Sequence, residues 1–429
     1  MARAENPVVE AADRLLKSFK SPATLLIAVS GGSDSTGLLV ALATLSATGR
    51  YPHIALSACT VDHGLRAGSA EEASLVAALC ARHGIAHTTR RWAGPKPEAG
   101  LQAAARAKRY ELLVEAAGAA GADAVLSAHT RDDQDETVAM RAVRSRDGIG
   151  LSGMADAVLL DGAVWLLRPF LGVGRAAIRS FLVAQGESWI DDPSNSNPRF
   201  ERARVRARDG VPAPEPAPGG RLSLAQRAAG YLAGSVQADG SLFLMAPPAV
   251  EAALSDPAAW RGLLLLAATA GGRTHTLEAR SADRLRAFLS SGTLSRLTAG
   301  RVVFDRRRDG LYLYRECRGI AGMTLPPEGK GAWDGRYRVH NRTSRAIVVS
   351  ACGEEAGRQS GGLRGPALRA HRAAPCLKFE DGGKVAEGGA GVEPLIAPYA
   401  RFLPRFDLPI AQALADIVGC GRFVHPPNE

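Results

Sequence analysis

Along the first half of the chain, short apolar runs of strand length alternate with longer segments in which apolar residues recur at helical spacing. The segment LLIAVSGGSDSTGLLVAL, residues 25–42, shows both patterns in succession. Residues 25–29 form an apolar run that predicts a buried strand, whereas Leu38, Leu39 and Leu42 recur at the spacing of a helix. The Ser-Gly-Gly turn between them therefore lies at the N-terminus of a helix.

The same alternation predicts further elements downstream. Expected strands lie at 53–62, 85–92, 122–129 and 163–169, and expected helices at 69–84, 101–121, 132–143 and 174–186. Ser69 is the expected N-cap of the first of these helices. Such alternation is typical of an α/β fold, a parallel sheet with helices on both faces, whose ligands bind beyond the carboxyl ends of the strands. We therefore expect residues 30–35, Asp62, His63 and His129 to lie at one edge of the sheet.

A Pro-rich stretch, VPAPEPAPGG at residues 211–220, predicts a stiff linker and a domain boundary. Residues 1–210 are expected to form a Rossmann-like parallel-sheet domain. Residues 221–318 are expected to be helical at first and then to form a hairpin, RVVFDRRRDGLYLYRE, with Asp309-Gly310 at its turn. Residues 319–429 are rich in Gly and Pro and predict a small α+β or β-rich C-terminal module.

Composition narrows the functional classes. The chain has 429 residues, 46% of them hydrophobic and 22% charged, which is typical of a globular protein with more than one domain. Its net charge of +10 indicates a polyanionic partner such as nucleic acid. The six cysteines include no Cys-x-x-Cys pair, which argues against a zinc site, an iron-sulfur cluster or a redox pair.

The location of the protein follows from what the chain does not contain. No run of about 18 uncharged apolar residues is present, so we expect no membrane span. The first residues carry acidic side chains and lack a continuous apolar core, so we expect no signal peptide. These patterns predict a cytoplasmic protein; they leave the oligomeric state open, with a homodimer as one candidate.

The Ser-Gly-Gly turn has the chemistry of a phosphate-binding loop. Backbone N–H groups at a helix N-terminus have no intrahelical partners, and the helix dipole adds partial positive charge. The loop holds only small or acidic residues, so no side chain blocks a phosphate: Ser30, Gly31, Gly32, Ser33, Asp34 and Ser35. Asp34 is placed to reach a metal ion on the phosphates. The alternative is a tight turn capped by Ser30 or Ser33, and the stretch is not a Walker A loop.

Acidic residues follow another predicted strand in SAHTRDDQDET, residues 127–137. Helical spacing places Asp132, Asp133 and Glu136 on a shared face of the following helix. At the edge of the sheet that carries a phosphate loop, these carboxylates are candidates for binding Mg²⁺ or an ammonium group, or for accepting a proton. The alternative is the ordinary preference of acidic residues for helix N-termini.

Two basic segments suit phosphate groups. Gln102, Arg106 and Arg109 form one polar stripe, and an arginine there can neutralise a leaving pyrophosphate; a solvated helix face is the alternative. DDPSNSNPRFERARVRARDG, residues 191–210, carries an arginine stripe suited to nucleic-acid phosphates, with a charged surface helix as the alternative.

GVGRAA at 172–177 matches Gly-x-Gly-x-x-Ala, but Pro169 interrupts the preceding strand, so we expect no dinucleotide site.

In this order, the motifs AVSGGSDS, VDHGLR, AARAKRY, SAHTRDDQDET, GLSGM, RPFL and DDPSNSNPRFERARVR resemble those of the tRNA(Ile)-lysidine synthetase family of PP-loop (N-type) ATP pyrophosphatases. The resemblance covers residues 24–208. It implies an enzyme that uses ATP and Mg²⁺ to adenylate the C2 oxygen of the wobble cytidine in tRNA(Ile) with a CAU anticodon, releasing pyrophosphate. The ε-amine of free lysine then attacks C2 and expels AMP.

The resemblance also implies roles for individual residues. The loop from Ser30 to Ser35 would bind ATP, with Asp34 supporting Mg²⁺. Asp133 and Glu136 would bind lysine and, with Asp34 and Arg106, would be catalytic. The residues implied to bind tRNA are Asn195, Arg202, Arg204 and Arg206.

The chain departs from the family pattern at two places. Arg144, Ser145, Arg146 and Asp147 stand where the family has Arg-Gly-Ser-Gly, and Ala203 stands where its Arg-Asn-x-Ile-Arg motif has Asn. Two other functions remain as alternatives: another PP-loop tRNA-modifying or nucleotidyl-activating enzyme, such as a thiolase, and a noncatalytic RNA-binding protein. The lack of Cys-x-x-Cys pairs argues against a thiolase, and the intact loop and acidic helix argue against a noncatalytic protein.

Overall fold

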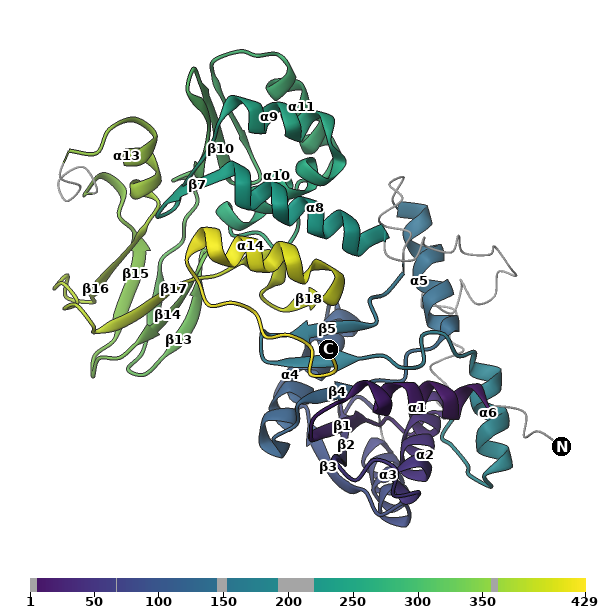
Figure 1. Ribbon diagram of the computed structural model, residues 1–429. Helices are drawn as coiled ribbons and strands as arrows, with labels where there is room; N and C mark the ends of the chain where they lie inside the picture. The colour runs from purple at the N-terminus through teal and green to yellow at the C-terminus, as the bar shows by residue number, and fades with distance from the viewer. Residues whose placement is uncertain (1–5, 67, 145–152, 192–219, 356–361) are drawn as a thin grey trace. The chain divides into compact units, whose positions relative to one another are not determined.

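The chain divides into two compact units. The computed structural model describes residues 6–66, 68–144, 153–191, 220–355 and 362–429. The first unit comprises residues 1–218 and 424–429, and the second comprises residues 219–423 (Figure 1). Among the helices of the described ranges, none combines the length and the apolar character that a membrane crossing requires.

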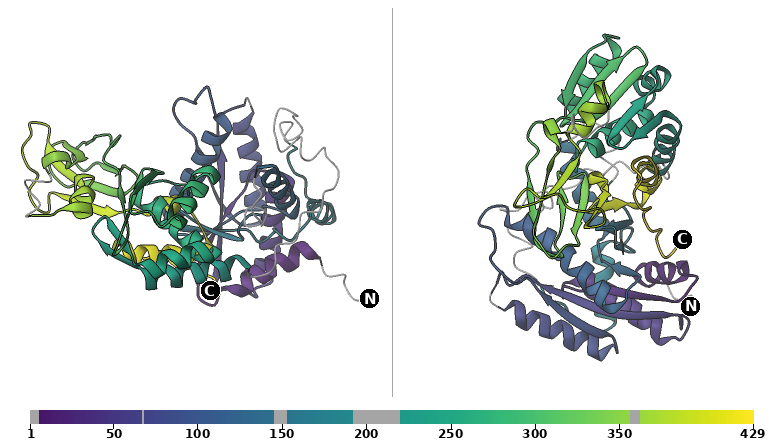
Figure 2. Two further views of the ribbon diagram at one scale, coloured as in Figure 1. Left: turned by 90° about the horizontal axis from the view of Figure 1, so that it is seen from above. Right: turned by 90° about the vertical axis from the view of Figure 1, so that its left-hand side faces the viewer.

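The first unit is an α/β fold. Its strands are β1 (Ala23–Ala28), β2 (Ile54–Asp62), β3 (Ala86–Arg91), β4 (Ala124–Leu126), β5 (Ala157–Leu160) and β6 (Val164–Leu167). Its helices are α1 (Pro7–Ser18), α2 (Ser33–Ala47), α3 (Ser69–Arg82), α4 (Leu101–Ala120), α5 (Arg131–Arg144) and α6 (Arg175–Ala184). The helices cover both faces of the sheet, as the views in Figures 1 and 2 show. This arrangement confirms the predicted fold class.

The order of the strands determines where a ligand can bind. In the first unit they follow β5-β6-β4-β1-β2-β3, and all neighbouring pairs except β5 and β6 are parallel. The chain moves from β1 outward to β3 and then returns to the other side of β1 with β4. The direction in which the chain adds strands to the sheet therefore reverses between β1 and β4. Ligands of open α/β sheets bind at such a switch point.

Two details of the first unit differ from the predictions. Strand β5 was not predicted from the sequence; it forms a hairpin with β6 through Asp161 and Gly162, both at positive φ, as an Asp-Gly hairpin turn requires. Ser69 was predicted as an N-cap, but it is the first residue of α3, and Gly68 occupies the cap position. The Ser69 side chain instead hydrogen-bonds to Asp62 and helps to lower the pKa of that carboxyl, against the opposing effect of burial.

The second unit begins with helices and an antiparallel sheet. Its first elements are α8 (Gly220–Ser235), β7 (Val236–Asp239), β8 (Leu242–Met245), α9 (Pro247–Ser255), α10 (Pro257–Ala270), α11 (Ala279–Ser290), β9 (Arg296–Ala299), β10 (Val302–Arg307) and β11 (Gly310–Arg315). The five strands follow β7-β8-β11-β10-β9. The hairpin of β7 and β8 lies in a region for which only helices were expected.

The remaining elements of the second unit include two small three-stranded sheets, β12-β15-β16 and β13-β14-β17. The strands are β12 (Met323–Leu325), β13 (Lys330–Trp333), β14 (Tyr337–Asn341), β15 (Ile347–Ala351), β16 (Pro375–Phe379), β17 (Ala390–Pro394) and β18 (Phe402–Pro404). The helices are α13 (Gly365–Arg372), α14 (Leu408–Val418) and the 3-10 turns η2 (Gly353–Glu355), η3 (Ala397–Tyr399) and η4 (Arg405–Asp407). Trp333, Val339 and Ile347 form the centre of the apolar core between the small sheets.

The predicted hairpin at 301–316 forms, but its turn lies one residue earlier than expected. Arg307 pairs with Gly310, so Arg308 and Asp309 form the turn and Gly310 begins β11. A Cβ at position 310 would lie 2.4 Å from the carbonyl oxygen of Met245. The glycine is therefore required by the close approach of β8 and not by the turn.

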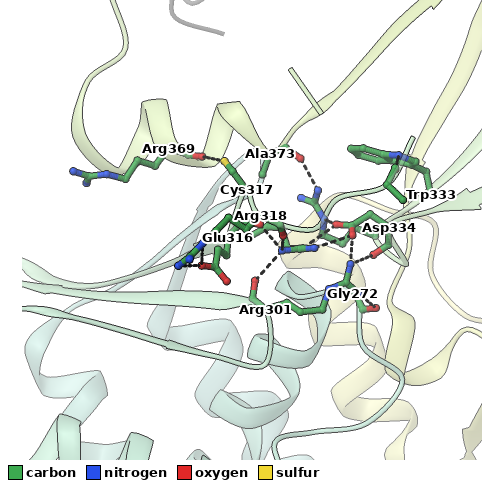
Figure 3. Close-up of polar contacts among 12 residues, drawn as sticks. Gly272, Arg301, Glu316, Cys317, Arg318, Trp333, Asp334, Arg369 and Ala373 are labelled. Atoms are coloured by element: carbon green, nitrogen blue, oxygen red, sulfur yellow. Dashed lines mark hydrogen bonds and ion pairs between the residues drawn. The ribbon is translucent and has the colours of Figure 1, made fainter. Parts of the chain in front are cut away.

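A buried carboxylate joins the large sheet of the second unit to the small sheets. Asp334, only 2% exposed, follows β13 and accepts hydrogen bonds from Arg301, Arg315 and Arg336 (Figure 3). The Nε atoms of Arg315 and Arg336 lie 3.0 and 2.7 Å from Asp334 Oδ2. Removing Asp334 would leave these arginines uncompensated. Such a change should destabilise the second unit strongly, because an unpaired buried charge is costly.

Candidate active site

The predicted phosphate loop lies at the switch point, directly after β1. Gly31 adopts φ +84°, in the left-handed region that favours glycine. Its carbonyl oxygen accepts hydrogen bonds from the N–H of Ile190, at 2.9 Å, and from Thr36 Oγ1, at 3.2 Å. A Cβ at position 31 would lie 2.7 Å from Ile190 Cδ1. The loop is thus held closely against the segment around Ile190.

Serine side chains hold the rest of the loop in shape. Ser35 Oγ accepts a hydrogen bond from the N–H of Ser30 at 3.1 Å and donates one to the carbonyl oxygen of Gly32 at 3.1 Å. Gly32 is the N-cap of α2 and, having no side chain, makes no capping hydrogen bond. As in any α-helix, the first N–H groups of α2 have no intrahelical acceptor, which suits this terminus to an anion.

The acidic helix α5 begins beside this loop, because β4, which precedes α5, pairs directly with β1. Asp133 Oδ2 accepts hydrogen bonds from the N–H and the Oγ1 of Thr130, at 2.8 and 3.1 Å. Glu136 lies one turn further along α5 and is buried. His129 lies in the segment between β4 and α5, with its Nδ1 3.0 Å from Ser127 Oγ.

One arginine joins the loop helix to the acidic helix. Arg175, the first residue of α6, places its Nε 3.0 Å from Asp34 Oδ2 and its Nη2 3.3 Å from Asp133 Oδ1. Its backbone N–H also donates to Asp132 Oδ2 at 2.8 Å. The structure therefore brings Asp34 and Asp133, carboxylates from two separate helices, onto one guanidinium.

The charges of this group influence one another. Burial raises the pKa of Asp34, and the nearby charge of Asp133 adds to this effect, whereas Arg175 opposes it. Burial disfavours the charged guanidinium of Arg175, but the surrounding carboxylates outweigh burial and raise its pKa. The site therefore holds closely spaced carboxylates that need a cation beside them, which suits binding of a metal ion or an ammonium group.

Arg106 makes a different contact. It is exposed on α4, and its guanidinium lies over the ring of Tyr110, 5.1 Å from the ring centroid. Burial would raise the pKa of Tyr110, but Arg106, Arg109 and Arg168 together lower it. His63, expected at the same edge of the sheet, packs edge-on against Trp92, and its pKa is lowered by burial and by Arg109.

Several predicted residues lie outside the described ranges. These are the residues expected to bind tRNA, Asn195, Arg202, Arg204 and Arg206, and the departures at Ser145, Arg146, Asp147 and Ala203. The linker expected at 211–220 lies outside them as well, except for its last residue. These expectations remain predictions.

The fit of the site to Mg²⁺ depends on Asp34. Among the described residues, no group of three or more His, Cys, Asp or Glu is arranged to hold a metal ion. A magnesium ion that accompanies a nucleotide needs only one or two carboxylates, because phosphates and water complete its coordination. Asp34 meets this requirement: among the described residues, Arg175 contacts its Oδ2 and Ser33 Oγ donates to its Oδ1 at 3.2 Å, so Oδ1 keeps a lone pair for a metal ion. The donor set therefore fits Mg²⁺ bound together with ATP phosphates.

Arg175 is the site residue that the sequence analysis missed. It lies within GVGRAA, a segment for which no dinucleotide site is expected. The overlooked signal was a positive residue in the first turn of a predicted helix, where the helix dipole disfavours positive charge. In the structure, three carboxylates compensate for this placement.

Comparison with known proteins assigns the chain to a family. Residues 5–209 match the profile of the PP-loop domain. The tRNA(Ile)-lysidine synthase of Rhizobium meliloti (strain 1021) is 46% identical, over 98% of this chain and 97% of its own length. Enzymes of the same name from Mesorhizobium japonicum and Brucella canis are 40% and 37% identical, over 93% and 92% of this chain and 93% and 94% of their own. This chain therefore belongs to the tRNA(Ile)-lysidine synthase family.

Proposed function

We propose that this chain joins lysine to tRNA(Ile) in an ATP-dependent reaction, forming lysidine, and that the reaction takes place between the N-termini of α2 and α5. The family supports the reaction, and the PP-loop domain supports ATP binding. The observation that carries the placement is the approach of Asp34 and Asp133 to one cation, the guanidinium of Arg175. This approach supports a nucleotide and an amine that both bind within the reach of one side chain.

In the first half-reaction, the C2 oxygen of the wobble cytidine attacks the α-phosphate of ATP, and pyrophosphate leaves. The N–H groups at the start of α2, with Ser30, Ser33 and Ser35, hold the phosphates in place. Asp34 would hold Mg²⁺, which when bound neutralises phosphate charge. Arg106 is assigned to the leaving pyrophosphate, because a guanidinium there would offset the charge that develops on it.

In the second half-reaction, the ε-amine of lysine attacks C2, and AMP leaves. The amine is nucleophilic only after it has lost a proton. Asp133 and Glu136 are assigned to bind the ε-ammonium, and one of these carboxylates accepts the proton. Burial of Glu136 suits this role, because a buried carboxylate strongly favours a nearby cation.

Contacts to the tRNA are assigned to basic side chains outside this site. Asn195, Arg202, Arg204 and Arg206 keep the role implied by the family motif. The helical and hairpin region at 221–318 is the second candidate, and residues 319–429 form the module that follows it. A depression of about 930 Å³ on β9 and β10 supports this assignment, because its lining carries five arginines against three acidic side chains, Asp305, Asp309 and Glu316. The arginines are Arg296, Arg306, Arg307, Arg308 and Arg318, and their excess of positive charge suits RNA phosphates. We place the enzyme in the cytoplasm, with its tRNA.

The test is transfer of labelled lysine by the full-length protein, given ATP, Mg²⁺ and tRNA(Ile) with a CAU anticodon. Label entering the tRNA with release of pyrophosphate supports the proposal, and label that stays free contradicts it. Asp34→Asn should still bind tRNA but should release far less pyrophosphate. If Asp34→Asn releases pyrophosphate at the wild-type rate, the placement of the nucleotide at this loop is wrong.

A further inference from the structure

Arg175 occupies a position that is costly for an arginine. It is the first residue of α6, where the partial positive charge of the helix dipole opposes a cation. Asp132 compensates locally by accepting the N–H of Arg175 at 2.8 Å, which fixes the backbone at this end of α6. The side chain then reaches away from its own helix to α2 and α5.

The two ion pairs of the guanidinium differ. The bond to Asp34 is the shorter, 3.0 Å from Nε, and the bond to Asp133 is 3.3 Å from Nη2. Both carboxylates are mostly buried, with side chains 22% and 14% exposed, and Arg175 is 20% exposed. The contact to Asp133 is therefore the more easily broken of the two.

Asp133 can change partners without moving. Its Oδ2 is held by the N–H and the hydroxyl of Thr130, so the carboxylate keeps its orientation when Oδ1 loses a partner. Oδ1 is the oxygen that contacts Arg175. A second cation that binds Asp133 at Oδ1 thus competes with the guanidinium for a single oxygen atom.

We propose that Arg175 is a positioning residue that joins the nucleotide site to the amine site through an exchangeable contact. The ε-ammonium of lysine displaces Nη2 from Asp133, while Nε stays on Asp34 and keeps the N-terminus of α2 in position. This inference rests on the assignment of Asp133 to lysine in the proposed function. Arg175 thus weakens lysine binding and favours turnover.

The proposal is tested by the kinetics of lysine transfer with the full-length Arg175→Gln variant. Loss of the competing cation should lower the KM for lysine about fivefold, a factor typical of one partly exposed ion pair. The kcat should fall about tenfold, because Asp34 loses the group that holds it. Structural damage would instead raise KM and lower kcat, so the opposite signs of the two changes identify the exchange.

The matched control is Arg179→Gln, one turn along the same helix. Arg179 is half exposed, and its ion pair with Asp191 is long, at 3.9 Å, so we expect wild-type values. Norleucine, which is lysine without the ε-amine, serves as the second control: as a competitor of lysine it should have the same inhibition constant in the wild type and in Arg175→Gln. Arg175→Lys keeps the charge but cannot span two carboxylates, so its KM for lysine should lie between those of the wild type and of Arg175→Gln.

The outcomes separate this inference from the proposed function. A lysine KM that is unchanged or raised in Arg175→Gln, in a protein with the wild-type melting temperature, overturns the exchange. If Arg175→Gln does not fold, Arg175→Lys decides, and a lysine KM at or above the wild-type value overturns the exchange. If Asp133→Asn leaves the lysine KM unchanged, the amine site itself is assigned wrongly, and the proposed function fails at that point.

Discussion

Replacing Gly31 by alanine tests whether the phosphate loop is held in the shape described. Gly31 has φ +84°, and a left-handed backbone costs a residue with a Cβ about 1–2 kcal/mol. The added methyl group would also lie 2.7 Å from Ile190 Cδ1 and 3.1 Å from Val76 Cγ2. Moving the Ile190 side chain off its preferred rotamer costs about 0.5–1.5 kcal/mol. We therefore expect Gly31→Ala to lower the free energy of unfolding of the first unit by about 2–3 kcal/mol.

Calorimetry measures this change as a shift of the melting temperature. For a unit of this size, about 2–3 kcal/mol corresponds to a decrease of about 5–10 °C. Gly32→Ala is the matched control, because Gly32 has φ −68° and a Cβ there would meet only Ser30 Oγ, at 3.8 Å. This control should lose less than about 1 kcal/mol, the cost of alanine at an N-cap.

A second substitution separates the two costs. Ile190→Val removes the Cδ1 methyl group, so in the Gly31→Ala background it relieves the contact but leaves the backbone cost. The double variant should therefore be more stable than the sum of the two single changes predicts, by about 0.5–1.5 kcal/mol. If Gly31→Ala melts like Gly32→Ala, the loop does not have the conformation described, and the argument for a preformed phosphate site fails.

Two further predictions concern other parts of the chain. Asp334→Ala leaves three arginines without their shared carboxylate and should destabilise the second unit by about 3–5 kcal/mol, measured by thermal unfolding; an unchanged melting profile would contradict the role of this cluster. In native protein titrated with a thiol reagent, Cys317, which is exposed, should react far faster than Cys80, whose thiol is buried and has a pKa of about 11. Mass spectrometry of the labelled peptides identifies the order, and early labelling of Cys80 would show that α3 does not pack as described.

The sequence alone predicted the fold of the first unit because its core is strongly patterned. The strand at 25–29 is almost fully buried, and a continuous apolar run is what burial on both faces of a sheet requires. Helix α4 was predicted at 101–121 and ends at Ala120, with Gly121 in the left-handed conformation as its cap. Such signals are local, so they can be read without the tertiary structure.

Signals of other kinds were missed. The strands β5 and β8 have four residues each, which is too short for a period to emerge, and β5 was marked only by the Asp-Gly turn that follows it. Gly310 was assigned to a turn because the sequence does not show that the backbone of β8 passes within contact of it. The first error comes from the shortness of the strands, and the second comes from a contact between segments that are distant along the chain.

The candidate site also combines residues that a local sequence pattern marks with a residue that only tertiary contacts explain. The sequence predicts a site at the loop 30–35 and at the acids of α5, because each is a local pattern at a strand end. Arg175 follows a different strand end, and its role depends on two carboxylates that precede it by 141 and 42 residues. In isolation, an arginine at the first position of a helix looks like a slightly unfavourable residue. A residue that violates a local preference and is compensated only through tertiary contacts indicates function more strongly than one that satisfies it, because folding alone supplies no reason to place it there.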